Sequence, residues 1–281
     1  MSEEPVYVCG HGPRELRRLE IQADFYGEIT RIFLQRAGLV AGMRVLDLGC
    51  GAGDVSFLAA ELVGATGMVI GIDRSSEAIA WARERTHVLG LSNVEFRVTH
   101  INSLQEWDVD AVIGRFVLMH QPDPAQTLRH AMRYVRRGGV LAFLESHLAA
   151  CVAGMHSYPY SPVYDRAIAF MKQCLQSAGA AIDMGMRLRA TFVSAGLPEP
   201  ELWLQARMEG GADAAIHTFT AESLRSMQVQ AVALGIAFPV QAEIDELETE
   251  LRAESRATGG VLTAPPVVGA WCTVPARTSG E

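Results

Sequence analysis

The sequence predicts an α/β fold in which a parallel β-sheet is covered by helices on both faces. Short apolar runs alternate with stretches whose apolar residues recur at helical spacing, which is typical of βαβ units. The apolar runs are nearly continuous, as expected for strands that are buried on both faces of a sheet. A glycine-rich turn directly follows the first run and precedes a helical stretch.

Five strands and four helices account for the first half of the chain. Each strand is a short aliphatic run, and the strands are expected at 43–48, 67–73, 94–98, 110–114 and 138–145. The helices are expected at 14–38, 55–63, about 76–89 and 125–135. Ser75 or Ser76 caps the third helix, and Gly90 stops it.

The alternation breaks after Glu145. Residues 146–163 hold several His and Tyr residues together with Pro159 and Pro162, a composition that predicts a loop. The remaining elements are expected in the order helix 163–179, helix 184–195, strand 201–207, helix 220–234, helix 240–256 and strand 267–274. The helix at 240–256 is acidic with one apolar side, which predicts an amphipathic surface helix; contact between two copies of the chain, a homodimer, is the alternative.

The composition is that of a globular protein with an acidic balance. Hydrophobic residues make up 49% of the 281 residues, enough to bury a sizeable core. The net charge of -8 argues against wholesale nucleic-acid binding, which depends on Lys and Arg neutralising phosphates. Five scattered cysteines form no C-x-x-C pair, so we expect reduced thiols, a cytoplasmic location and no metal site. Neither a signal peptide nor a membrane span is expected.

The strongest functional signal is the glycine turn Asp47-Leu-Gly49-Cys-Gly51-Ala-Gly53-Asp54 at the end of the first strand. Glycines permit positive φ and close approach to a ligand, and the following helix N-terminus attracts negative charge. The second strand ends on Asp73, an acidic residue placed to accept hydrogen bonds from ribose hydroxyls. A dinucleotide fold would need G-x-G-x-x-G, but the third glycine position, counted from Gly49, is Asp54.

The pattern D-x-G-x-G-x-G resembles the first motif of class I S-adenosylmethionine-dependent methyltransferases. The resemblance continues through VIGIDRS, VEFRV, VIGRFVLMHQPDP and RRGGVLAFLE, and it is closest to the small-molecule branch that includes ubiquinone/menaquinone-type enzymes. It covers roughly residues 16–145 closely and the remainder loosely. It implies a Rossmann-like sheet of seven strands, mostly parallel with an antiparallel last strand, and a helical lid. It also implies S-adenosylmethionine as cofactor.

The resemblance also implies roles for individual residues. Gly49, Gly51 and Gly53 would line the methionine part of the cofactor, with Asp47 bracing the loop. Asp73 would bind the ribose hydroxyls. The other residues implied to lie against the cofactor are Arg74 beside the adenine and Arg115 and Phe116 beside the sulfonium. This chain has Thr99-His100-Ile101 where the family has an acidic pair, so His100 and the Ile101 backbone are the candidates for the adenine contact.

Three residues are candidates for a general base, which methyl transfer needs only when the acceptor carries a proton. Glu145 and His147 follow the fifth strand at the carboxyl edge, where ligands bind in open α/β sheets; a solvated edge is the alternative. His120 ends the RFVLMH segment and has a suitable ordinary pKa, although a buried structural histidine is the alternative. The expectation ranks Glu145 and His147 ahead of His120.

The resemblance to class I methyltransferases implies a lid, and the residues of the segment after the fifth strand suggest a substrate pocket. We expect a single domain over 1–281, with a core of about 39–145, 183–207 and 263–275 and a lid of 1–38, 146–182 and 208–262. Tyr26, on the first helix, and His156, Tyr158 and Tyr160, in the loop after the fifth strand, are candidates for the pocket wall; plain packing is the alternative.

The expected function is S-adenosylmethionine-dependent methylation of a small, apolar-bodied metabolite at an O, N or C atom. Two alternatives stay open: a catalytically silent cofactor-binding or scaffold protein, and a methyltransferase that acts on a macromolecule. The absence of an N-P-P-Y-like run after the fourth strand argues against the macromolecular alternative.

Overall fold

The computed structural model describes residues 13–100, 108–236 and 241–275. Its centre is a seven-stranded sheet in the order β3-β2-β1-β4-β5-β10-β7. The strands are β1 (Arg44–Leu48), β2 (Met68–Asp73), β3 (Val94–Val98), β4 (Val109–Arg115), β5 (Val135–Ser146), β7 (Glu201–Gln205) and β10 (Val267–Thr273). Only β10 runs antiparallel to its neighbours, so the expected class I methyltransferase topology is confirmed.

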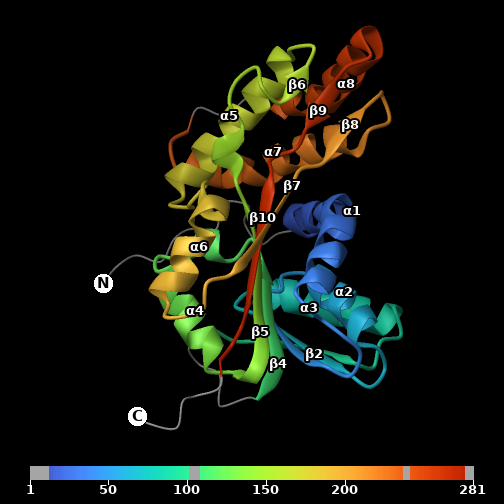
Figure 1. The fold of residues 1–281 in the computed structure, drawn as a ribbon. Coiled ribbons are helices and arrows are strands. Elements are labelled where there is room, and N and C mark those ends of the chain that lie inside the picture. Colours follow the sequence, from blue (N-terminus) through green and yellow to red (C-terminus); the bar gives the residue numbers. More distant parts are fainter. Residues whose placement is uncertain (1–12, 101–107, 237–240, 276–281) are drawn as a thin grey trace.

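Helices cover both faces of this sheet, as Figure 1 shows. The helices α1 (Pro13–Arg36), α2 (Asp54–Val63) and α3 (Ser76–Val88) lie on one face, and α4 (Pro124–Met132) and α6 (Met184–Ser194) lie on the other. The alternation along β5 accounts for the two cores: Leu141 and Phe143 pack toward α4 and α6, whereas Ala142 and Leu144 pack toward α1.

The order of the strands decides where a ligand can bind. The chain moves outward from β1 through β2 to β3, then returns to the other side of β1 to form β4 and β5. The connections after β1 and β4 therefore leave in opposite directions and open a crevice at the carboxyl ends of these strands. The helix starts that border the crevice are capped by side chains, with Ser75 accepting the N–H of Ala78 and Asp123 accepting the N–H of Gln126.

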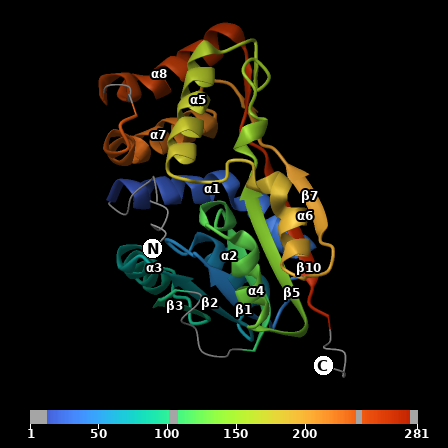
Figure 2. The same ribbon diagram turned by 90° about the vertical axis from the view of Figure 1, so that its left-hand side faces the viewer.

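A second layer lies beyond the carboxyl edge of the sheet (Figure 2). It contains α5 (Pro162–Ser177), α7 (Ala215–Ala233) and α8 (Gln241–Thr258). It also contains a small antiparallel sheet of β6 (Ser157–Tyr158), β9 (Val261–Thr263) and β8 (Met208–Gly210), which the sequence patterns did not predict. Strands of two or three residues are too short to show a two-residue period.

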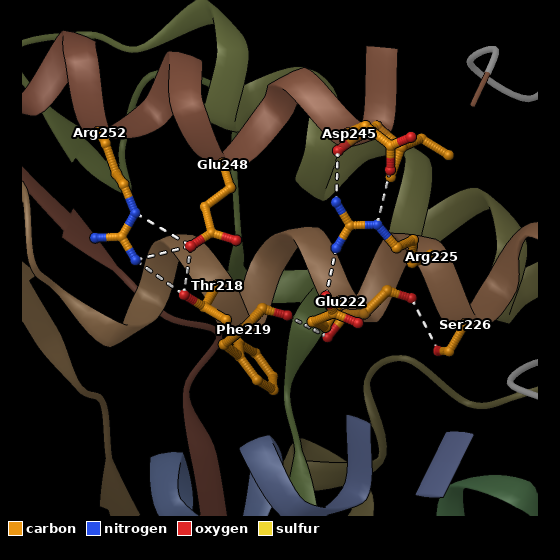
Figure 3. Close-up of polar contacts among 10 residues, drawn as sticks. Thr218, Phe219, Glu222, Arg225, Ser226, Asp245, Glu248 and Arg252 are labelled. Atoms are coloured by element: carbon orange, nitrogen blue, oxygen red, sulfur yellow. Dashed lines mark hydrogen bonds and ion pairs between the residues drawn. The ribbon is translucent and has the colours of Figure 1, made fainter. Parts of the chain in front are cut away.

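Polar contacts hold α8 against α7 (Figure 3). Arg252 donates to Glu248 at 2.8 Å and to the hydroxyl of Thr218 at 3.0 Å. Further along α7, Arg225 pairs with Glu222 and, at 3.1 Å, with Asp245 of α8. The ring of Phe219 points away from α8 in this view, toward α1. The α8 contacts therefore fix the side of α7 that faces away from the site.

In the described ranges, no helix is long and apolar enough to cross a membrane.

Candidate functional site

A cavity of about 560 Å³ lies at the carboxyl edge of the sheet, between the sheet and the second layer. Its floor is formed by the ends of β1, β2, β4 and β5, represented by Leu48, Asp73, Arg115 and Ser146. Helices α1, α5 and α7 contribute its upper walls. This volume is within the range of roughly 300–1,000 Å³ that is typical of small-molecule and cofactor sites.

The glycine turn forms one wall of the cavity, and its glycines differ in what they do. Gly49 and Gly51 line the cavity with φ of 61° and 52°. A Cβ on Gly49 would lie 2.9 Å from Cγ2 of Val117, so the turn has no room for a side chain there. Gly53 is not among the residues that line the cavity: it caps α2 at φ 90°, and a Cβ there would lie 2.7 Å from the ring of Phe96. Its smallness therefore serves packing.

Asp73 ties the glycine turn to the start of α3. One carboxylate oxygen accepts the N–H of Gly51 at 3.0 Å, and the other accepts the N–H of Ser75 at 2.9 Å. The side chain still lines the cavity, so its remaining lone pairs are available to a ligand. Arg74 and His100 stand on the same wall. Ile101 lies outside the described residues.

Asp47 braces the glycine turn from behind the cavity wall. It is 1% exposed, and one of its oxygens accepts the hydroxyl of Ser56 in α2 at 2.6 Å. Burial raises its pKa to about 7 because the charged form loses solvation, and the hydrogen bond from Ser56 lowers it in part. Asp47 thus connects the strand to the helix and does not border the cavity.

The end of β4 brings Arg115 and Phe116 to the cavity opposite Tyr26. Phe116 has a φ of 57°, a conformation that costs a non-glycine residue about 1–3 kcal/mol, and its ring meets that of Tyr26 edge-on at 5.4 Å. Arg115 donates to the hydroxyl of Thr30 in α1 at 3.0 Å. This corner joins the cofactor side of the cavity to its apolar upper part.

Glu145 holds the turn that follows Phe116. It is completely buried, and its carboxylate accepts the N–H groups of Val117, Leu118 and Met119 at 2.9, 2.8 and 3.2 Å. Desolvation raises its pKa to about 7, while the three hydrogen bonds lower it in part. Glu145 is not among the residues that line the cavity, because β5 alternation turns it toward α4 and α6, together with Phe143.

The two candidate histidines lie in different places. His120, at the end of the η2 turn (Leu118–His120), lines the cavity, whereas His147 is not among its lining residues and lies near the start of α6. Burial lowers the pKa of His120 to about 4, helped by the positive charges of Arg18 and Arg74. Of the three candidate bases, His120 lines the cavity, and Glu145 and His147 do not.

Of the four candidate substrate residues, the structure brings only Tyr26 to the cavity. Tyr26 is 3% exposed and packs among Phe25, Phe116 and Phe219. Tyr158 and Tyr160 are 77% and 58% exposed on the second layer. His156 is buried there, 2.7 Å from Asp165. Pro162 starts α5 directly after this segment, and the three residues belong to the second layer without lining the cavity.

Sequence reasoning missed most of the upper wall. Phe219 and Met227 of α7 and Met171 of α5 line the cavity, although their patterns are those of ordinary core helices. One signal was present: Glu15, Arg18 and Gln22 follow each other at helical spacing on α1, and all three are buried polar residues. Arg18 donates to Glu15 at 2.6 and 2.7 Å and to Gln22 at 2.6 Å. A polar stripe on an otherwise apolar helix face predicts a site.

In the part of the chain that the structure describes, no three His, Cys, Asp or Glu side chains are grouped so as to hold a metal ion.

The comparison with protein families gives a single clear result. The methyltransferase domain model matches residues 39–186, just over half of the 281 residues. The match includes the glycine turn, Asp73 and the β4 and β5 ends that form the floor of the cavity. The chain belongs to the methyltransferase domain family. The expected resemblance to class I methyltransferases is thereby confirmed.

The alignments with curated relatives from this methyltransferase family cover only part of each relative's length. The arsenite methyltransferase of Aquipseudomonas alcaligenes is 34% identical over 44% of this chain and 37% of its own length. The demethylmenaquinone methyltransferase of Oceanobacillus iheyensis is 28% identical over 60% of this chain and 75% of its own. The chain spans between a quarter and a half of the length of several others, including a second arsenite methyltransferase from Halobacterium salinarum.

Solved structures agree on the fold of this chain. The YcgJ protein of Bacillus subtilis superposes with a TM-score of 0.55 at 15% identity, over 90% of this chain and all of that one. Phosphoethanolamine N-methyltransferase 2 of Haemonchus contortus, solved with S-adenosylhomocysteine, gives a TM-score of 0.56 at 16% identity, over 92% and 58% of the two chains. Both support the seven-stranded architecture.

Proposed function

We propose that this chain transfers a methyl group from S-adenosylmethionine to a small molecule with an apolar body. The observation that carries the proposal is the single cavity wall formed by Gly49, Gly51 and Asp73, continuous with an apolar chamber under α5 and α7. The helices of the second layer that line this chamber support a metabolite as the acceptor, because a macromolecule would need an open groove. The four described cysteines are free thiols, which supports a cytoplasmic location.

The cavity wall suits the cofactor. A Cβ on Gly51 would lie 3.6 Å from Cδ1 of Leu19, so a side chain there would fill the space between the turn and α1, which the glycine leaves to a ligand. Asp73 would accept hydrogen bonds from the ribose hydroxyls, and Arg74 and His100 would flank the adenine. The bound cofactor supplies a methyl group on a sulfonium whose departure leaves a neutral thioether.

The residues of this chain mainly bind, orient and exclude water. Phe116, Tyr26 and Phe219 form an aromatic corner that restricts how an acceptor can lie, and such alignment is worth up to ~7–11 kcal/mol of the barrier. His120 is neutral at pH 7 because burial lowers its pKa to about 4, so its ring nitrogen is a weak base. This favours an acceptor that is already deprotonated or that needs no base.

The cavity also distinguishes between the substrates of the relatives. Trivalent arsenic binds thiolates, and of the described cysteines only Cys50 lines the cavity. The apolar chamber instead supports a ring-bearing acceptor, such as those named for the demethylmenaquinone and aklanonic acid methyltransferases.

Calorimetry with S-adenosylhomocysteine tests the cofactor assignment. Asp73→Ala removes charge-assisted hydrogen bonds worth about 1.5–3 kcal/mol, so we expect affinity to fall at least tenfold. Asp73→Asn keeps an acceptor oxygen, so we expect its affinity for S-adenosylhomocysteine to lie between those of the wild type and Asp73→Ala. Affinity that is equal in all three proteins would refute the assignment.

Transfer of labelled methyl to quinones and aromatic acids tests the reaction. Binding of S-adenosylhomocysteine without any transfer to these compounds or to cell-extract metabolites would favour the catalytically silent alternative.

A further inference from the structure

The charges around the cavity do not balance. The acidic side chains on its wall are already engaged: Glu15 by Arg18 at 2.6 Å, Asp54 by Arg85 at 2.6 Å and Asp73 by two backbone N–H groups. Asp123, also on the wall, caps α4 and lies 3.6 Å from Arg129. None of these carboxylates is within ion-pair distance of Arg115.

Arg115 is a buried cation that forms no ion pair with a described carboxylate; Asp54 and Asp47 act on it only from beyond ion-pair distance. It is 9% exposed, and among the described residues its one hydrogen bond goes to the neutral hydroxyl of Thr30. A guanidinium has five N–H donors and stays ionised in proteins. No nitrogen of Arg115 is both fully buried and without a hydrogen-bond partner. The donors that Thr30 does not engage are therefore accessible from the cavity that the side chain lines. A buried charge without a partner is costly, and a bound anion would remove that cost.

Tyr26 adds a second donor at the same place. It lines the cavity next to Phe116, and among the described residues its hydroxyl has no hydrogen-bond partner. Arg115 donates to Thr30, one helical turn after Tyr26 on α1, and the ring of its neighbour Phe116 lies 5.4 Å from that of Tyr26, so the two polar side chains meet at the same corner. The same cavity is lined by the apolar Phe219, Leu148 and Met171 and by the polar Gln22 and Ser146.

We propose that Arg115 and the hydroxyl of Tyr26 form a carboxylate-binding site in the wall of the cavity. A carboxylate fits the planar guanidinium through two parallel N–H···O bonds and can accept the phenol O–H as well. The inference rests on the proposed function, which supplies two sources for this group: the amino-acid part of the cofactor, or an acidic acceptor molecule. A cationic acceptor is excluded from this corner by the charge of Arg115.

The experiment measures binding by calorimetry to the wild-type chain, Arg115→Met and Thr30→Ala. Thr30→Ala removes the hydrogen bond to Arg115 but keeps the cation, so it controls for disturbed packing. Arg115→Lys, with a charge but no planar fork, is the second variant, and thermal unfolding checks that each protein folds. The probes are S-adenosylhomocysteine and methylthioadenosine, which lacks the amino-acid part. A second pair of probes, 1-naphthoate and its neutral isostere 1-naphthamide, is measured in the presence of saturating S-adenosylhomocysteine.

Two results would support the proposal and identify the source. If the cofactor supplies the carboxylate, Arg115→Met weakens S-adenosylhomocysteine at least tenfold and leaves methylthioadenosine unchanged. If the acceptor supplies it, S-adenosylhomocysteine is unaffected, and the wild-type complex binds naphthoate at least tenfold more tightly than naphthamide, a preference that Arg115→Met abolishes. Thr30→Ala should behave like the wild type, and Arg115→Lys should retain part of the effect.

The site is refuted if Arg115→Met, folded as judged by its thermal transition, changes the affinity of neither carboxylate probe. A wild-type chain that fails to bind S-adenosylhomocysteine would instead contradict the proposed cofactor function, so the two failures are distinguishable.

Discussion

Replacing Glu145 with glutamine should change how the stability of the protein depends on pH. Burial raises the pKa of Glu145 from its ordinary value of 4.5 to about 7, and the side chain is 0% exposed. Between these values the native protein keeps a proton that the unfolded chain releases, so rising pH favours unfolding. One pKa unit corresponds to about 1.36 kcal/mol, so the ionised carboxylate costs roughly 3 kcal/mol above pH 7 and nothing below pH 4.5.

The glutamine side chain carries no charge at any pH, so the variant lacks this pH-dependent loss of stability. We expect urea denaturation of Glu145→Gln and wild type, measured from pH 4 to pH 8, to show curves that converge or cross. The variant should gain about 3 kcal/mol relative to wild type across the window. Other groups, such as His120 with its lowered pKa, shift both curves equally and cancel in the difference. Asp47→Asn is the matched comparison, because burial raises the pKa of Asp47 to about 7 as well.

The same carboxylate should act on binding in the opposite direction. Only the ionised form offers full acceptor capacity to the three N–H groups of the turn at 117–119, which lines the cavity. Affinity for S-adenosylhomocysteine should therefore rise from pH 6 to pH 8 in the wild type and stay flat in Glu145→Gln. Parallel stability curves, together with parallel affinity profiles, would refute this account of Glu145.

Further predictions concern the turn, the base and the walls. Gly49→Ala should lower stability by about 1–3 kcal/mol in urea denaturation, because φ is 61° and the new Cβ would lie 2.9 Å from Val117; Val117→Ala should relieve only the contact. The maximal rate should show no ionisation from His120 between pH 5.5 and pH 8, and an inflection near 6.5 that His120→Ala removes would contradict this. Phe219→Ala should cost about 3–5 kcal/mol of stability, since its ring stacks on that of Phe25 at 4.4 Å. Tyr160→Ala should leave turnover within about twofold, and a tenfold loss would place Tyr160 in the site after all.

The cofactor wall was predictable from sequence because its residues are close together along the chain. The glycine turn, the strand before it and the acidic end of the next strand form one βαβ unit, so local spacing already places Gly49, Gly51 and Asp73 at one edge. The antiparallel last strand followed from the resemblance to a known family, and the structure confirmed it.

The sequence by itself determined the α/β architecture, the glycine turn and the acidic residue that follows it, since each depends on periodicity or short spacing. Only the tertiary structure decided which polar residues face the cavity. Glu145 and Ser146 are neighbours on β5, yet one faces three backbone N–H groups and the other lines the cavity. The hydrogen bond from Arg115 to Thr30 depends on how α1 packs across the end of β4, between residues 85 positions apart. Contacts at that separation leave no periodic trace in the sequence, because they arise only when the helix and the sheet bury their apolar faces together.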